Sequence, residues 1–341
     1  MTTLRMELGS RSYDIHIGGG LIAKADKYLD LDRKVFILTD DGVPAQYAQT
    51  VAALAEDAFV LTIPQGEESK SLETYDRVCK AMLDFGMSRG DCAVAVGGGV
   101  IGDLCGFAAS TYMRGVDFYN IPTTVLSQVD SSIGGKCAID FHGVKNIIGS
   151  FYQPKCVIVD IELLSTLDSR QVSNGLAEAV KMALTSDRDL FEFFEKCEDI
   201  SAHLEEIVVG ALKIKKSVVE ADEKEGSLRK ILNFGHTLGH GIESLGGRYH
   251  GECVALGMLP MCSGKVRARL VEVLKKLSLP HAFTDDIDVE KALAFAAHDK
   301  KADSSSVSAV FVDTVGKFRL ERIALTGFYT HIRETIDDCK E

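Results

Sequence analysis

The stretch from Asp91 to Met113, DCAVAVGGGVIGDLCGFAASTYM, constrains the fold of this chain most strongly. A short apolar run, Ala93 to Val96, leads directly into three glycines, and a helical pattern of small residues follows. An apolar run bounded by glycine is typical of a buried parallel strand that delivers the chain to the N-terminus of a helix. Gly97, Gly99 and Gly102 satisfy G-x-G-x-x-G, so bare backbone N–H groups could approach a pyrophosphate there.

This motif alone does not separate a dinucleotide site from a tight turn, because a turn with positive φ also requires glycine. Two details depart from the usual dinucleotide fingerprint. The motif follows the third or fourth predicted strand, and Asp117, the acid at the expected spacing, falls at the start of a strand. A dinucleotide bound here would therefore imply a fold other than an ordinary Rossmann domain.

Strand and helix patterns alternate through the first half of the chain, which predicts an α/β domain with a mainly parallel sheet. The expected elements are an opening hairpin over 6–17, strands at 34–38, 58–63, 93–96, 116–121 and 155–160, and a helix over 72–85 that ends at Gly86. Residues 123–154 carry glycines, small polar residues and two lysines instead of a periodic pattern, which suits a segment that lines a site.

Beyond Asp160 the periodicity becomes mainly helical, except for a small hairpin expected around 306–320. Helices are expected at 175–185, 190–197, 205–223, 232–244, 253–277 and 289–297, with a last one ending near 338. We therefore predict two domains, an α/β domain over 1–160 and a mainly α-helical domain over 161–341.

Net charge and cysteine usage indicate which partners are disfavoured and which compartment is expected. The 341 residues carry a formal net charge of −12, which disfavours nucleic acid and anionic membranes because no basic stripe would release counterions. Nine cysteines occur without a CxxC pair, as expected for reduced thiols and hence a cytoplasmic protein. The N-terminus has no apolar signal region, and no window approaches the ~18 apolar residues of a spanning helix.

The second half holds a histidine motif, NFGHTLGH over 233–240, followed by His250-Gly-Glu252. His236 and His240 are four residues apart, so on a helix both imidazoles would project from one face and could share a metal. This spacing leaves open whether both bind the metal or only one does, with the other handling protons or substrate. Glu178 interrupts an apolar face and is a candidate third ligand; the alternative is a solvated helix glutamate.

Positive side chains form the other candidate cluster, in glycine-rich or mixed segments of an acidic chain: Arg114, Lys136, Lys145, Lys181, Lys215 and Arg229. Most surface charges merely interact with solvent. A small anion with phosphate and carboxylate ends, however, needs several such donors, because one exposed pair contributes only about 0 to 1 kcal/mol. A metal, a dinucleotide and a set of cations together suggest redox-assisted chemistry on a phosphorylated polyol.

An ordered set of motifs resembles the sugar phosphate cyclase family, in particular the 3-dehydroquinate synthases. These motifs are GEESKS, GGGVIGD, YMRG, PTTVLSQVDSSIGGK, GVKNIIGSFYQP, GLAEAVK, DEKEGSLRKILNFGHTLGH, HGECVALGM and Asp299-Lys300-Lys301. The resemblance implies an NAD-binding α/β domain, a helical metal-binding domain and a homodimer. It also implies a divalent metal, zinc or alternatively cobalt, held by Glu178, His236 and His250.

The resemblance further implies the remaining site residues. Those expected to bind NAD are Gln65, Gly66, Glu67, Glu68, Ser69, Lys70, Gly98, Gly99, Val100, Ile101, Gly102, Asp103, Thr123, Thr124, Lys136, Lys145, Leu163, Leu164, Ser165 and Thr166. Those expected to contact substrate are Asp130, Lys136, Asn146, Lys181, Lys215, Arg229, Asn233, His240 and Lys300 or its neighbour Lys301, with Arg114 as a phosphate ligand. Asp140 replaces an asparagine common in relatives and could weaken anion binding if it faces the site.

The implied reaction converts 3-deoxy-D-arabino-heptulosonate 7-phosphate, a phosphorylated C7 keto acid sugar, into 3-dehydroquinate and phosphate in the shikimate pathway. Three alternatives stay open: another cyclase of the valiolone or scyllo-inosose type, a polyol dehydrogenase that releases NADH, and a non-catalytic paralogue. A cyclase of the other types would act on substrates without the carboxylate. A non-catalytic paralogue should have lost a metal ligand or a lysine, and the sequence retains them all.

Overall fold

The computed structural model describes residues 1–298 and 306–340, which form two compact units, Met1–Asp168 and Ser169–Glu341. Residues 161–168, placed with the second domain by sequence, pack with the first unit. Asp160 accepts a hydrogen bond from Glu162 N, which starts the 3₁₀ turn Ile161–Thr166, and Leu163 enters the core beside the sheet. In these described ranges no helix is both long enough and apolar enough to cross a bilayer.

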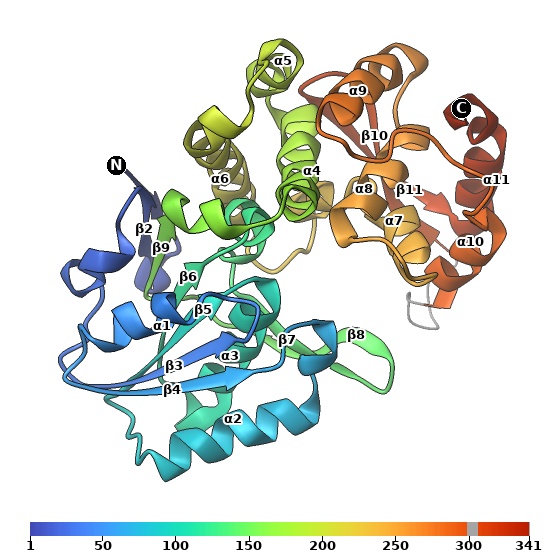
Figure 1. Cartoon of the computed structure of the whole chain (residues 1–341). Coiled ribbons are helices and arrows are strands. Elements are labelled where there is room, and N and C mark those ends of the chain that lie inside the picture. The colour runs from blue at the N-terminus through green and yellow to red at the C-terminus, as the bar shows by residue number, and fades with distance from the viewer. Residues whose placement is uncertain (299–305, 341) are drawn as a thin grey trace. The chain divides into compact units, whose positions relative to one another are not determined.

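Seven strands form one sheet in the first unit, in the order β1-β2-β9-β6-β5-β3-β4 (Figure 1). They are β1 Thr2–Met6, β2 Tyr13–Gly18, β3 Lys34–Asp40, β4 Asp57–Ile63, β5 Cys92–Gly97, β6 Asp117–Pro122 and β9 Cys156–Asp160. The β1–β2 pair is antiparallel, and every other pair in this sheet is parallel. The predicted opening hairpin and mainly parallel sheet are both confirmed.

Helices cover both faces of this sheet. They are α1 Ala45–Ala52, α2 Leu72–Asp84 and α3 Gly99–Thr111. Alternate residues of β3 point to opposite faces: Val35 and Ile37 share a core with α1, whereas Phe36 and Leu38 share one with α2 and α3. Because both faces are buried, the central strands are almost continuously apolar.

The order in which successive strands join the sheet reverses between β3 and β5. The chain runs outward from β3 to β4, returns past β3 to β5, and then proceeds the other way to β6 and β9. The carboxyl ends of strands beside such a switch point are the usual place for a ligand in an open α/β sheet. The topology therefore indicates a candidate ligand site at the carboxyl ends of β3 and β5 and of their neighbours β4 and β6.

Residues 123–154 contain structure that the sequence did not predict. A π-helical turn, Ser127–Ser131, precedes a separate two-stranded sheet of β7 Lys136–Phe141 and β8 Val144–Phe151. Cys137 and Ile139 of β7 join the core on the α3 side of the main sheet. The segment gave no helical or strand periodicity because most of β8 is solvent-exposed and the chain turns through residues with positive φ.

The second unit is mainly helical, as predicted. Its helices are α4 Ser169–Ser186, α5 Arg188–Lys196, α6 Leu204–Ala221, α7 His236–Glu243, α8 His250–Met258, α9 Gly264–Lys276, α10 Val289–His298 and α11 Leu325–Thr335. The hairpin expected near 306–320 is confirmed as β10 Ser306–Thr314 and β11 Lys317–Ala324. The expected fold class, an α/β domain with a mainly parallel sheet followed by a mainly helical domain, is therefore confirmed.

Two long helices expected from periodicity were wrong. The region 232–244 contains a 3₁₀ turn, Leu228–Asn233, then Gly235 in the left-handed conformation, and α7 begins only at His236. The region 253–277 is divided into α8 and α9 by a 3₁₀ turn at Leu259–Met261 that contains Pro260. Apolar residues continue through both breaks, so the periodicity did not reveal them.

Helices α7 and α8 approach closely through glycines. A Cβ atom added to Gly257 of α8 would lie 2.0 Å from the carbonyl oxygen of Gly235 and 2.9 Å from Gly239 N, both backbone atoms. Only a glycine at this position allows the two helices, which carry the histidine motif, to pack at this distance.

Replacing Gly257 by alanine is expected to lower the free energy of unfolding of the second unit by about 3 kcal/mol, since backbone atoms must move to admit the methyl group. Urea denaturation followed by circular dichroism measures this. Gly327→Ala in α11 is the matched control: an added Cβ there has no heavy atom within 4 Å, and a gain of about 0.5–1 kcal/mol is expected. Equal stability of the two variants would contradict the close packing of α7 and α8.

Candidate functional site

Three helices of the second unit bring the predicted metal ligands together. Glu178 lies on α4, His236 is the first residue of α7 and His250 is the first residue of α8. The Nε2 atoms of His236 and His250 lie 3.6 and 3.5 Å from Glu178 Oε1. Glu178 is fully buried, so the alternative of a solvated helix glutamate does not hold.

The two imidazoles are oriented through their other nitrogen atoms. His236 Nδ1 lies 3.1 Å from Phe234 O, and His250 Nδ1 lies 3.0 Å from Glu243 Oε2. A carbonyl or an ionised carboxylate only accepts hydrogen bonds, so each Nδ1 carries the hydrogen and each Nε2 is left to face Glu178. This is how metal-binding histidines are held in proteins.

The carboxylate of Glu178 itself fits a cation. Both oxygens are buried and neither accepts a hydrogen bond of normal geometry, although Lys181 Nζ forms an ion pair with Oε2. A buried carboxylate with this little hydrogen bonding is costly unless another cation compensates it. Two imidazole nitrogens and one carboxylate are also a common ligand set of catalytic zinc sites, which keep an open position. The residues therefore fit a divalent metal.

The charges around Glu178 are strongly coupled. Burial disfavours its ionised form, but Lys181, His236 and His250 outweigh burial and hold the Glu178 pKa well below its usual range. Burial and the neighbouring Lys181 lower the pKa of His236, which keeps this imidazole neutral, as a metal ligand must be. Burial opposes protonation of His250 as well, but the nearby carboxylates of Glu178 and Glu243 raise its pKa to about 9 in the metal-free chain.

His240 lies beside this group. One nitrogen each from His236, His240 and His250 lies within 4.8 Å of the other two, and the His240 ring centroid is 5.2 Å from that of His236. His240 is exposed, and it comes from the turn of α7 that follows His236. Its position suits a residue that meets substrate next to a metal.

Buried positive side chains surround the same helices. Lys181 on α4, Lys215 on α6 and Arg229 in the 3₁₀ turn Leu228–Asn233 are 1%, 5% and 1% exposed. Lys181 Nζ also donates to Leu232 O at 2.6 Å, which joins α4 to this turn. Lysine and arginine are almost never fully buried without a partner or a function. The elements that carry these three buried cations, which the sequence assigned to substrate, contact one another.

Asp222 shapes the loop that presents Arg229. Its carboxylate accepts hydrogen bonds from the backbone N–H groups of Gly226, Ser227 and Arg229 at 2.9, 2.7 and 3.0 Å. Bonds from Arg229 N and Ser227 N lower the Asp222 pKa to about 2. The acidic segment that follows α6 is therefore an ordered loop, and Asp222 holds the backbone of Arg229 in place.

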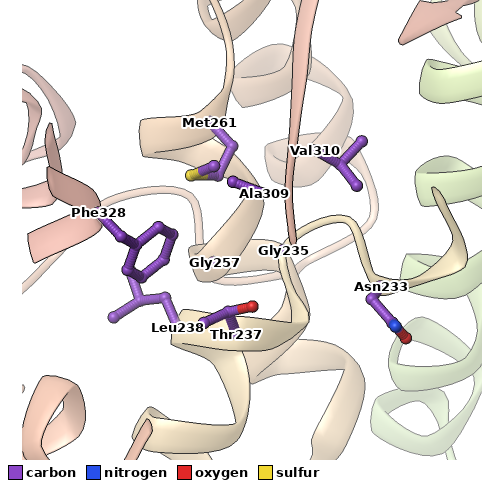
Figure 2. Close-up of a pocket in the computed structure, with 9 residues that line it drawn as sticks. All are labelled: Asn233, Gly235, Thr237, Leu238, Gly257, Met261, Ala309, Val310 and Phe328. Atoms are coloured by element: carbon purple, nitrogen blue, oxygen red, sulfur yellow. The ribbon is translucent and has the colours of Figure 1, made fainter. Parts of the chain in front are cut away.

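Asn233, another predicted substrate residue, lines a small cavity beside the first turn of α7 (Figure 2). Figure 2 shows the Asn233 side chain at one edge, turned away from the apolar side chains of Met261 and Phe328. The other lining residues are Gly235, Thr237, Leu238, Gly257, Ala309 and Val310. With a volume of about 10 Å³, the cavity is at most the size of one water molecule. Asn233 Nδ2 donates to Glu225 Oε1 at 2.8 Å.

In the first unit, the residues expected to bind NAD follow the carboxyl ends of four parallel strands. Gln65–Lys70 come after β4, Gly98–Asp103 after β5, Thr123 and Thr124 after β6, and Leu163–Thr166 after β9. Thr123 N donates to Gly97 O at 3.0 Å, which links the β5 and β6 loops directly. The strands therefore gather four segments that are distant in sequence at one edge of the sheet.

Two of these residues pair with each other. Lys70 Nζ lies 2.6 Å from Asp103 Oδ2, and the lysine is 4% exposed. Burial alone would lower the Lys70 pKa, but Asp103 and Glu67 raise it. Lys70 O also accepts a hydrogen bond from Asp140 N at 2.8 Å, so this loop is fixed to the β7–β8 hairpin.

The remaining predicted residues of the first unit are more open to solvent. Lys136, Lys145 and Asn146 are exposed on the β7–β8 hairpin, and Arg114 is exposed in the turn after α3. Asp130 lies in the π-helical turn, and such turns are frequent at functional sites. Lys300 and Lys301 lie outside the described residues.

Asp140, the departure from the common asparagine, has a local structural contact. Its Oδ1 accepts a hydrogen bond from Asn146 N at 2.8 Å, across the turn of the hairpin. Asn146 has a φ of 55°, a conformation that needs such support in a residue other than glycine. The carboxylate at this position therefore holds the backbone of a predicted substrate residue.

Sequence reasoning missed Asp222 and Glu243. Asp222 comes directly after a helix and before a Gly-Ser turn, as residues that cap loops often do. Glu243 is three residues after His240, on the helix face that carries the histidines. A carboxylate three residues after a candidate metal-binding histidine could have indicated a hydrogen-bond partner for a metal-binding imidazole.

Comparison with known proteins gives similarity over nearly the whole chain. Residues 60–174 match the family "3-dehydroquinate synthase N-terminal" and residues 175–302 match "3-dehydroquinate synthase C-terminal". A 3-dehydroquinate synthase of Clostridium acetobutylicum is 37% identical over 98% of this chain and 99% of its own length.

Solved structures agree in fold over the same extent. A 2-deoxy-scyllo-inosose synthase complexed with carbaglucose-6-phosphate, NAD⁺ and Co²⁺ has a TM-score of 0.88, with 28% identity, over 99% of this chain and 100% of that one. A 2-epi-5-epi-valiolone synthase from Streptomyces hygroscopicus with NAD⁺ and Zn²⁺ bound has a TM-score of 0.87, with 25% identity, over 97% and 99%.

Proposed function

The chain belongs to the 3-dehydroquinate synthase family, and from this we propose that it converts 3-deoxy-D-arabino-heptulosonate 7-phosphate into 3-dehydroquinate and phosphate. It is an NAD- and metal-dependent carbon–oxygen lyase of the shikimate pathway. Transient oxidation of the C5 alcohol acidifies the adjacent C–H bond, so phosphate leaves by β-elimination. The C5 ketone is then reduced again, the ring opens, and an intramolecular aldol reaction closes the carbocycle. Hydride is borrowed and returned, so no NADH accumulates.

The observation that carries this function is the buried carboxylate of Glu178 facing two oriented imidazoles. We assign Glu178, His236 and His250 as the ligands of the divalent metal. When bound there, a zinc or cobalt ion supplies Lewis acidity to the substrate oxygens. Lys181, whose Nζ contacts the second oxygen of Glu178, keeps this carboxylate ionised and fixes its direction.

The loops at the carboxyl ends of β4, β5, β6 and β9 are proposed to hold NAD. When bound, NAD⁺ accepts the hydride and returns it. The N-terminus of α3 offers backbone N–H groups to the pyrophosphate, and Gly99 has no side chain to obstruct them. The ion pair between Lys70 and Asp103 joins the loops that follow β4 and β5 at this edge of the sheet.

The substrate is proposed to be held mainly by cations. In the second unit these are the buried Lys181, Lys215 and Arg229, and Asn233 and His240 are proposed to contact substrate with them. Asp130, Lys136, Asn146 and Arg114 of the first unit complete the proposed set with Lys300. Placing both anionic ends of the substrate is itself catalytic, because ring closure depends on orientation.

Two further properties follow from the family resemblance. We propose that the chain forms a homodimer, which light scattering coupled to gel filtration tests. We also propose that it works in the cytoplasm, which the nine free cysteines support, because a reducing compartment keeps thiols in this form.

The function is tested by incubating the purified chain with 3-deoxy-D-arabino-heptulosonate 7-phosphate, Zn²⁺ and a substoichiometric amount of NAD⁺. Equal amounts of phosphate and 3-dehydroquinate are expected by NMR, in excess over NAD⁺, with no rise in absorbance from NADH. Net NADH would instead indicate a polyol dehydrogenase. Phosphate release only from sugar phosphates without a carboxylate would indicate a cyclase of the other types, and no release from any of them would indicate a non-catalytic protein.

A further inference from the structure

Helix α7 carries a carboxylate, Glu243, that has no role in the proposed reaction and is not among the predicted metal ligands. Glu243 is the last residue of α7, one turn after His240 and two turns after His236, on the same side of the helix. Its Oε2 lies 3.0 Å from Nδ1 of His250, the first residue of the next helix. Both side chains are largely buried, at 17% and 27% exposed, so water competes poorly for this contact.

The backbone around His250 is fixed by other residues. Gly251 N donates to Asn174 Oδ1 of α4 at 2.6 Å, and Tyr249 N donates to Glu252 Oε2 at 2.9 Å. Glu252 in turn forms a two-point ion pair with Arg170 of α4, at 2.6 and 2.9 Å. Helix α8 is therefore tied to the helix that carries Glu178. The main freedom left to His250 is rotation of its ring and the choice of nitrogen that carries hydrogen.

Glu243 removes both freedoms. An ionised carboxylate cannot donate, so the hydrogen must lie on Nδ1, and the hydrogen bond fixes the plane of the ring. Nε2 then faces Glu178 Oε1 at 3.5 Å. His236 obtains the same orientation from a neutral group, Phe234 O. The two imidazoles thus differ, because the one beside a carboxylate is the stronger electron donor through Nε2.

We propose that Glu243 is a positioning residue of the metal site, which sets the tautomer and ring orientation of His250 and strengthens its bond to the divalent metal. This inference rests on the proposed metal site, but it does not depend on which sugar phosphate the enzyme uses. Loss of such a partner of a metal-binding histidine typically weakens metal affinity 10- to 100-fold.

The test measures metal binding without turnover. Zn²⁺ affinity is determined by competition with a chromophoric chelator, and Co²⁺ binding by visible absorption, for the wild type and for Glu243→Gln and Glu243→Ala. A 10- to 100-fold rise in the Zn²⁺ dissociation constant and an altered Co²⁺ spectrum are expected for both variants. Formate, a small carboxylate, is expected to restore part of the affinity of Glu243→Ala and to leave that of the wild type unchanged.

Glu192→Gln is the matched control. It removes one carboxylate from the same unit, at a surface site where Glu192 pairs with Arg188 and Lys196. Its metal affinity should equal that of the wild type. The near-isosteric Glu243→Gln keeps the test valid if Glu243→Ala does not fold. Wild-type metal affinity in Glu243→Gln, or a lowered affinity accompanied by an equally lowered stability of the metal-free protein, would overturn the inference.

The wild type could fail to convert the heptulosonate while Glu243→Gln still binds metal more weakly than the wild type does. In that case the substrate proposal fails and the role of Glu243 stands. If the wild type binds no Zn²⁺ or Co²⁺ at all, the proposed metal site fails and the inference fails with it.

Discussion

Replacing Glu178 by glutamine is expected to lower kcat by at least ~10³-fold, because several kcal/mol of metal-dependent transition-state stabilisation are lost. A neutral amide is a poor metal ligand, and it presents a hydrogen-bond donor where the structure requires only acceptors. The variant should also purify with little zinc. Steady-state phosphate release and elemental analysis of the purified protein measure the two effects.

The same substitution has a separate effect on stability. It leaves the ammonium group of Lys181, which is 1% exposed, with the carbonyl of Leu232 but without its counter-ion. Removing one partner of a buried ion pair costs about 3–5 kcal/mol. The double variant Glu178→Gln, Lys181→Met is therefore expected to recover stability toward urea and to remain inactive, which separates folding from chemistry.

Glu206→Gln serves as the control, since Glu206 is an exposed residue of the same unit that pairs with His203. It should match the wild type in zinc content, stability and turnover. Full activity of Glu178→Gln in metal-free buffer would contradict the assignment of the metal ligands.

Replacing Arg229 by alanine is expected to raise KM for the heptulosonate about 30- to 100-fold, which corresponds to the loss of one charge-assisted contact of about 2–3 kcal/mol. The guanidinium group is 1% exposed, and the Asp222 loop holds its backbone, so it is placed in advance to meet an anion. Arg229→Lys should fall between the wild type and alanine, because a lysine keeps the charge but loses the planar, two-point geometry. Arg229→Met, which preserves more of the buried volume, separates binding from packing.

The comparison that isolates the carboxylate uses two competitive inhibitors, one with the carboxylate and one without it. Arg229→Ala should weaken the first and leave the second nearly unchanged. Lys230→Ala, at the adjacent and less buried position of the same 3₁₀ turn, should leave both unchanged. Equal effects on the two inhibitors would show that Arg229 does not bind the substrate carboxylate.

Most of the architecture could be predicted from the sequence because its signals are local. The apolar run from Ala93 to Val96 followed by glycines identified β5 and the start of α3, and the alternating patterns identified the parallel sheet. The β7–β8 hairpin gave no periodicity, since one strand is mostly solvated. The ends of α7 and α8 depend on Gly235 and Pro260, around which apolar residues continue without a break.

For the candidate site too, some features could be predicted from local sequence and others could not. Local spacing named His236 and His240 as possible ligands, but it could not choose between them. In the structure His250, together with His236, faces the buried carboxylate of Glu178. It does so because α8 begins at His250 and contacts α4. Asp140 was expected to weaken anion binding if it faced the site; in the structure its carboxylate holds the backbone of Asn146.

The sequence by itself determined which residue types are available and where most strands and helices lie, since these depend largely on neighbours within a few positions along the chain. Only the tertiary structure decided that Glu178 is buried, that Lys70 pairs with Asp103, and that Glu243 reaches His250. The reason is physical. Burial, ion pairing and the tautomer of an imidazole depend on groups that meet through packing of separate elements, and the distance along the chain does not specify those contacts.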